Sequence, residues 1–175
     1  SQTENLITSM LGFVRGGSLL CLEPAKVKTV IEEAVSSCDG ILEASGALLT
    51  TNRINPSLKI LAAPAELSSV IANMIQNSIQ VCEDKPEIEV WAGAINQHMM
   101  LIRVSDNGPG IPSDVIDQVF DPFFTTRAAG TGLGLAVLAS VVQRHGGTVH
   151  ATNRESGGAQ FTILLPVDST SKAST

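Results

Sequence analysis

Two asparagines lie four residues apart in the stretch PAELSSVIANMIQNSIQVCE, and their type and spacing could do chemistry. Asn73 and Asn77 share one face of a helix, because four residues make about one helical turn. The residues around them are apolar, and an amide buried without partners costs free energy. One interpretation is a solvated polar face. The other is a pair of amide oxygens aimed at a hard cation such as Mg²⁺, which commonly shares its ligands with phosphates.

A second candidate is the turn VSDNGPGIP, in which Asp106 ends a predicted strand and Gly108 and Gly110 follow. Turns of this composition are common, so the motif alone is a weak signal. A carboxylate fixed at a strand end can accept a hydrogen bond from an exocyclic amine, and glycines let the backbone approach a flat ring. An adenine base offers both the amine and the ring.

A third candidate is GTGLGLA, residues 130–136, which leads directly into a predicted helix. It is neither the dinucleotide fingerprint nor a P-loop. Backbone N–H groups at such a helix start, at the positive end of the helix dipole, can hold a phosphate. Just before it, FDPFFTT contains Phe120, Phe123 and Phe124, three of the five phenylalanines. These phenylalanines either anchor a mobile loop or belong to the core.

The elements that position these motifs follow from hydrophobic periodicity and turn signals. Helices are predicted over 22–46, 64–83 and 133–147, and two short strands broken at Asn55-Pro56 over 47–62. Strands are also predicted over 87–95 and 99–106, and over 148–155 and 158–167 as a hairpin. Hairpins rather than regular βαβ units indicate an α+β fold, a two-layer sandwich with a mostly antiparallel sheet of about five strands and about three helices.

Composition limits the partners. The chain has 175 residues, a formal net charge of −6, 43% hydrophobic and 16% charged residues, which indicates a globular protein without a nucleic-acid or anionic-lipid partner. No apolar run is as long as a membrane span, so no membrane contact is expected. Cys21, Cys38 and Cys82 are scattered, which fits buried thiols in a reducing compartment, and we expect a cytoplasmic location.

In order and spacing, the motifs resemble the ATP-binding domain of sensor histidine kinases, in the superfamily shared with gyrase, Hsp90 and MutL. NMIQNS looks like the N box, DNGPGI like the G1 box, FDPFF like the F box and GTGLGLA like the G2 box. The resemblance covers roughly residues 64–166. It implies the Bergerat fold with a flexible ATP lid, and ATP and Mg²⁺ as cofactors. The PFFTT spelling looks most like the nitrogen-regulation branch, whose partners are typically response regulators that activate σ54 promoters, including flagellar ones.

The resemblance also implies roles. Asn77 would be the Mg²⁺ ligand, with Asn73 beside the phosphates, and both would be catalytic. Asp106 would hold the adenine amino group. Gly132 and Gly134 would approach the β- and γ-phosphates, and residues 120–130 would form the lid, from which Arg127 would reach a phosphate. The remaining nucleotide-binding positions would be Gly108, Gly110, Ile111, Phe120, Phe124, Thr125, Thr126, Gly130, Thr131, Leu133, Leu135 and Thr162.

The same positions favour a kinase over a hydrolase. Hydrolytic relatives carry a glutamate four residues before the metal-binding asparagine, and here that residue is Asn73, which cannot accept a proton. Phosphoryl transfer to an imidazole needs no strong base, because neutral histidine is already a nucleophile. Glu66 and Glu83 lie seven residues before and ten after Asn73, and these offsets do not fit a base.

None of the three histidines lies in the setting that the family uses for its phosphoacceptor. His145 is predicted to cap a helix end, and His98 and His150 to lie on strand surfaces. Residues 1–17 resemble the end of the second helix of the dimerisation and phosphotransfer hairpin. Residues 18–167 would be the catalytic domain and 168–175 a disordered tail. The acceptor would then lie upstream, on a hairpin that acts in cis or in trans and passes the phosphoryl group to a receiver domain.

Two alternatives stay open. A serine kinase of the anti-sigma type shares the ATP site, although it would not begin with a remnant of a phosphotransfer hairpin. A nucleotide-sensing module in a degenerate kinase would bind nucleotide and transfer nothing.

Overall fold

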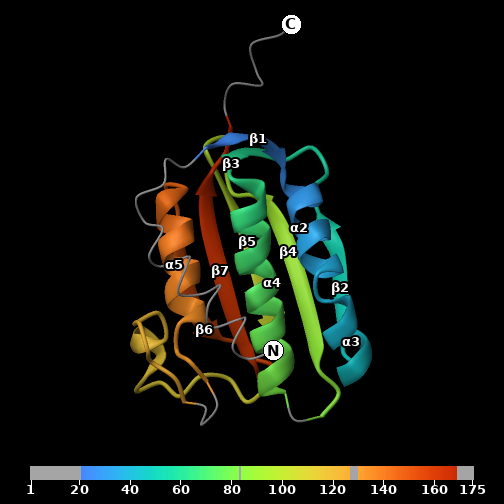
Figure 1. The fold of residues 1–175 in the computed structure, drawn as a ribbon, viewed down its shortest axis with the longest axis vertical. Helices are drawn as coiled ribbons and strands as arrows, with labels where there is room; N and C mark the ends of the chain where they lie inside the picture. Colours follow the sequence, from blue (N-terminus) through green and yellow to red (C-terminus); the bar gives the residue numbers. More distant parts are fainter. Residues whose placement is uncertain (1–20, 83, 127–129, 169–175) are drawn as a thin grey trace, which may run out of the picture.

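A five-stranded sheet with helices over one face forms the body of the protein (Figure 1). The computed structural model describes residues 21–82, 84–126 and 130–168. The strand order is β2-β4-β5-β7-β6, and only the β2–β4 pair is parallel. The strands are β2 (Leu48–Ile54), β4 (Glu87–Ala94), β5 (Met99–Asp106), β6 (Thr148–Asn153) and β7 (Ala159–Pro166). The predicted two-layer α+β sandwich is confirmed.

The helical layer consists of long helices that run along the sheet, with the short helix beside them (Figure 1). They are α2 (Val27–Ser36), α4 (Pro64–Val81), α5 (Gly134–Arg144) and the short α3 (Asp39–Ser45), with a 3₁₀ turn η1 (Ile116–Gln118). The central helix α4 contacts α2 on one side and α5 on the other. The described residues therefore contain four α-helices, where about three were predicted. In the described part of the chain, no helix is long and apolar enough to cross a membrane.

The prediction of one helix over residues 22–46 is wrong. The chain first forms β1 (Glu23–Lys26), which pairs antiparallel with β3 (Lys59–Ala62), and the helix begins only at Val27. Pro24 is compatible with either reading, because proline tolerates both a helix start and a strand without neighbours on its N–H side. The helical pattern is broken again at Cys38, whose fully buried thiol donates to the carbonyl of Ala72 on α4 at 3.6 Å.

Strand alternation decides which side chains face the helices. Successive residues point to opposite faces of a sheet, and the buried ones face the helical layer. On the other face, Trp91, Arg103, Thr162 and His150 form one row across β4, β5, β7 and β6. The Arg103 guanidinium stacks over the Trp91 ring at 5.8 Å from its centroid. The core is made by Ile88, Val90, Ala92, Met100, Ile102, Val104, Phe161, Ile163 and Leu165 from the sheet and by Val27, Val30, Ile31, Leu67, Ile71, Met74, Ile75, Leu138 and Val142 from the helices.

Several predictions concern residues that the structure does not describe. Residues 1–17, Glu83, Arg127 and 169–175 lie outside the described residues. Asp168, predicted as the first residue of a disordered tail, instead belongs to the fold. It is buried, and its N–H donates to the carbonyl of Lys59 at 3.2 Å.

His145 connects the end of α5 to the start of α4. It is only 4% exposed, its Nε2 accepts from the N–H of Ala63 at 3.0 Å, and its Nδ1 lies 2.7 Å from the carbonyl of Val141. Since Nε2 must accept, this network assigns the ring proton to Nδ1. The histidine thus satisfies one backbone group at each helix terminus, as its predicted capping role required.

Replacing His145 by alanine is expected to lower the free energy of unfolding by about 2–4 kcal/mol, because it leaves a buried N–H unpaired and a cavity in its place. Urea denaturation measures this loss. The exposed His150 on β6 provides the matched control, for which the alanine variant should differ from wild type by less than about 0.5 kcal/mol. Equal losses in the two variants would contradict this role for His145.

Candidate functional site

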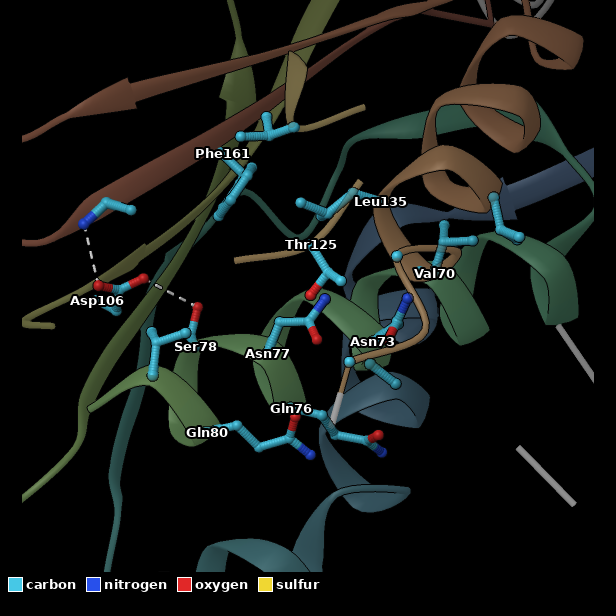
Figure 2. A pocket seen from close by; sticks show the side chains of 18 of the residues that line it. Val70, Asn73, Gln76, Asn77, Ser78, Gln80, Asp106, Thr125, Leu135 and Phe161 are labelled. Atoms are coloured by element: carbon cyan, nitrogen blue, oxygen red, sulfur yellow. Dashed lines mark hydrogen bonds between the residues drawn. The ribbon is translucent and has the colours of Figure 1, made fainter. Parts of the chain in front are cut away.

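A cavity of about 840 Å³ lies beside α4, between this helix, the turn after β5 and the start of α5 (Figure 2). This is within the range of small-molecule sites. It brings together motifs that are far apart in the sequence. The predicted site residues that line it are Asn73, Asn77, Asp106, Gly110, Ile111, Phe124, Thr125, Thr126, Gly130, Thr131, Gly132, Gly134 and Leu135.

Other predicted site residues do not line the cavity. Thr162 lies on the opposite face of the sheet, so its predicted place in the nucleotide site is wrong, and its neighbour Phe161 lines the cavity instead. Leu133 is buried at 5% exposure. Gly108 does not line the cavity, and its N–H donates to Oδ1 of Asp106. Arg127 lies outside the described residues.

The three phenylalanines of the FDPFF motif have three different environments. Phe120 packs edge-on against Phe161, with ring centroids 6.3 Å apart and planes at 81°, so it anchors the segment to the core. Phe124 is partly buried and lines the cavity. Phe123 is 69% exposed at φ 68°, and its N–H donates to the carbonyl of Gly132 at 2.9 Å. The sequence left anchor and core as alternatives, and Phe120 is both.

The hydrogen bond between Phe123 and Gly132 requires a glycine at position 132. It has φ 65°, and a Cβ added to it would lie 2.3 Å from the carbonyl carbon of Phe123. A side chain at this position would push the backbone of Phe123 away from the glycine-rich segment. The backbone bond therefore holds Phe123 and Gly132 together beside the cavity.

At one end of the cavity, the carboxylate of Asp106 is only 1% exposed and is held by donors from three segments. Its Oδ1 accepts from the N–H of Gly108 at 2.9 Å and from the N–H of Ala159 at 3.0 Å. Its Oδ2 accepts from the hydroxyl of Ser78 at 3.2 Å (Figure 2). Bonded donors let a carboxylate stay ionised in a buried place. Asp106 can therefore present acceptor oxygen to an amine of a bound ligand.

Asn153 and Arg154 support this end of the site, and the sequence analysis missed both. The Asn153 side chain accepts from the N–H of Ile111 at 2.7 Å and donates to its carbonyl at 2.7 Å. Arg154 donates from Nη1 to the carbonyl of Asp106 at 2.8 Å. These bonds fix the DNGPGI turn to β6. No local pattern signals them, because the partners lie more than forty residues apart.

At the other end, Asn73 and Asn77 project from α4 into the cavity (Figure 2). A Cβ on Gly134 would lie 2.7 Å from Nδ2 of Asn73, so this amide stands directly against the start of α5. The N-cap residue of α5 is Leu133, which makes no side-chain capping bond. The side chain of Leu133 therefore does not cap the first N–H groups of α5, and N–H groups at a helix start can bind anions.

The donor set fits Mg²⁺ shared with phosphates rather than a metal held by protein alone. Among the described residues, no group of three His, Cys, Asp or Glu could hold a metal ion. Amide oxygens are suitable Mg²⁺ ligands, and Mg²⁺ usually completes its shell with water and phosphate oxygens. Asn77 and Asn73 could supply such oxygens next to the anion-binding start of α5.

Charge is scarce in the cavity. Its described lining contains the carboxylates of Glu33 and Asp106 and no Lys, Arg or His. Glu66 on α4 does not line the cavity and instead forms an ion pair with Arg144 at 2.6 Å. An anionic ligand in this part of the site would therefore depend on backbone N–H groups and a bound cation.

The chain is similar to known proteins in sequence and in fold. Residues 62–169 match the family described as histidine kinase-, DNA gyrase B- and HSP90-like ATPases. Sensor histidine kinase ZraS of Escherichia coli K12 is 36% identical over 155 residues, which are 87% of this chain and 33% of that protein. Sporulation kinase E of Bacillus subtilis 168 is 29% identical over 164 residues, covering 94% of this chain and 22% of that protein. The chain thus spans a third or less of these relatives.

Solved structures show the same fold. The catalytic domain of histidine kinase ThkA matches with a TM-score of 0.75 and 25% identity, covering 83% of this chain and 95% of that one. Full-length ShkA in complex with AMPPNP matches with a TM-score of 0.81 and 24% identity, covering 93% and 35%. ThkA in complex with the response regulator TrrA matches with a TM-score of 0.79 and 22% identity, covering 94% and 48%.

The thiol of Cys82, at the end of α4, reports on the charge of Asp106. Burial, and then the negative charge of Asp106, raise the pKa of this thiol. The variant Asp106→Asn should lower that pKa, so iodoacetamide should alkylate Cys82 about two- to fivefold faster at pH 8. Peptide mass spectrometry measures the rate. The exposed Cys21 serves as internal control and should react equally in both proteins, whereas an unchanged rate at Cys82 would show that Asp106 carries no charge nearby.

Proposed function

We propose that this chain binds ATP with Mg²⁺ for transfer of the γ-phosphoryl group to a histidine on an upstream helical hairpin. The chain belongs to the histidine kinase-, DNA gyrase B- and HSP90-like ATPase family, and it carries the catalytic domain of a protein-histidine kinase. The observation that carries the proposal is that one cavity contains two chemically different groups at its opposite ends. One end has a buried carboxylate, and the other has two asparagines at an uncapped helix start.

The residues divide the work of binding. Asp106 would accept a hydrogen bond from the adenine amino group. Asn77 would hold Mg²⁺, which when bound would neutralise phosphate charge, and Asn73 would lie beside the phosphates. The N–H groups at the start of α5 face the phosphates, and Arg127 in the lid adds a cation. Phosphoryl transfer depends mainly on position and charge stabilisation, which these groups supply.

The absence of a catalytic base among the described residues of the cavity supports transfer over hydrolysis. Position 73 is asparagine, and Glu66 is engaged by Arg144. Glu33, on α2, lines the cavity but is exposed to solvent. An imidazole acceptor brings its own nucleophilic lone pair and needs no such base.

We also propose where the acceptor and the partner lie. His145 uses both ring nitrogens within the fold. His98 follows β4 in an exposed loop, His150 lies on the uncovered sheet face, and neither lines the cavity. We therefore assign the acceptor histidine to an upstream helical hairpin, whose end residues 1–17 resemble in sequence. The hairpin hands the phosphoryl group to a response regulator receiver domain.

We also propose two finer assignments. The PFFTT spelling supports a place near the nitrogen-regulation branch, with a σ54-activating regulator as the partner. The cytoplasm, where ATP is available, is the expected compartment, and free cysteines fit it.

Calorimetric titration with a non-hydrolysable ATP analogue tests the site. Asp106→Asn should weaken binding by about 10- to 100-fold, because a hydrogen bond to a charged group is lost. Asn77→Ala should bind with Mg²⁺ no more tightly than wild type binds without it. Asp114→Asn, the same change at an exposed position outside the cavity, should bind like wild type. Wild-type affinity in Asp106→Asn would show that the base binds elsewhere.

Incubation with γ-labelled ATP tests the location of the acceptor. The chain alone should incorporate no label, since its described histidines lie away from the cavity. Adding a helical hairpin from a matched full-length kinase should produce acid-labile label on the hairpin histidine. Stoichiometric label on residues 1–175 alone would refute the assignment.

A further inference from the structure

We propose that Ser78 is a specificity-determining residue, whose hydroxyl occupies one lone pair of Asp106 and so limits the cavity to a base that presents a single amine N–H at this edge. The inference rests on the proposed function and deepens it, since it assigns a residue to the choice of adenine over guanine.

Most acceptor sites of the Asp106 carboxylate are occupied within the fold. An ionised carboxylate has about four lone-pair sites. On Asp106, two are taken on Oδ1 by the N–H groups of Gly108 and Ala159, and one is taken on Oδ2 by Ser78. One acceptor site remains, on Oδ2. The side chains of Ser78 and Asp106 are both buried, at 1% exposure. The carboxylate therefore cannot turn without breaking these bonds.

Adenine and guanine differ in the hydrogen-bond donors that they present to a carboxylate. The edge of adenine that meets a carboxylate offers one amine N–H beside an acceptor nitrogen. Guanine offers two adjacent donors, N1–H and the 2-amino group, which together suit a carboxylate with two free acceptors. With one acceptor left, guanine would bury one donor unpaired. A buried polar group left without a hydrogen-bond partner discriminates strongly between two otherwise similar ligands.

Of the three donors to Asp106, Ser78 is the one that donates through its side chain. Gly108 and Ala159 donate through the backbone, so side-chain substitution does not remove those bonds. Ser78 interrupts the apolar face that α4 presents to the sheet, between Ile75 and Ile79. A hydroxyl in such a place costs free energy unless it is bonded. Its bond to Asp106 satisfies it, and Ser78 lines the cavity beside the remaining acceptor.

Competition binding of ATP, GTP and purine riboside triphosphate, which lacks the amine, to wild type and Ser78→Ala tests the proposal. Wild type should prefer ATP to GTP. In Ser78→Ala the second lone pair of Oδ2 becomes free, so GTP gains relative to ATP and the preference should fall about tenfold. The affinity for purine riboside triphosphate should change less than the affinity for ATP.

Ser105→Ala is the matched control. Ser105 is also a buried serine, at 3% exposure, and precedes Asp106 in the chain. Its hydroxyl donates to Gln160 at 3.4 Å, on the sheet face away from the cavity. This variant should keep the wild-type preference. Thermal unfolding without nucleotide verifies that each variant is folded, and Ser78→Cys, with a weaker donor, replaces Ser78→Ala if the latter does not fold.

Equal weakening of all three nucleotides in Ser78→Ala, with the ATP preference unchanged, would overturn the proposal and leave Ser78 a structural residue. An unchanged preference in Ser78→Cys would overturn it in the same way. Failure of wild type to bind any of the nucleotides would instead remove the proposed function itself.

Discussion

The buried carboxylate of Asp106 is the constraint on which the rest of the site depends. A charge at 1% exposure is costly unless hydrogen-bond donors surround it. Here the donors come from the turn after β5, from the start of β7 and from the last turn of α4. Three segments that are distant in sequence must therefore meet at one point. That meeting fixes α4 against the sheet, and with it the positions of Asn73 and Asn77.

The opposite end of the cavity is organised by backbone rather than by charge. Its polar side chains include the amides of Asn73 and Asn77, and the start of α5 contributes N–H groups that the side chain of its N-cap residue, Leu133, does not bond. Backbone dipoles do not enter the net charge of a sequence. An acidic chain can for this reason contain a site for phosphates, although its charge of −6 argues against a nucleic-acid partner.

Much of this site could be predicted, because its motifs are local. The spacing of Asn73 and Asn77 places them on one helix face whatever surrounds the helix, and a glycine-rich segment before an apolar helix indicates an anion site by itself. The failures involve long-range pairing. Pro24 fits a helix start or a strand, and only the pairing of β1 with β3, more than thirty residues on, decides between them. Thr162 was misplaced because a one-residue difference in register reverses the face of a strand.

By itself, the sequence determined the α+β class, the central helix with its polar positions, the strand that ends in Asp106 and the order of the four motifs. These features depend on periodicity and on turn residues, which act over a few positions. Tertiary structure alone decided that Ser78, Ala159, Asn153 and Arg154 belong to the site, and that Phe161 rather than Thr162 faces the cavity. The physical reason is that each of these roles is a hydrogen bond or a strand register between distant segments, and such partners become neighbours only when the chain folds.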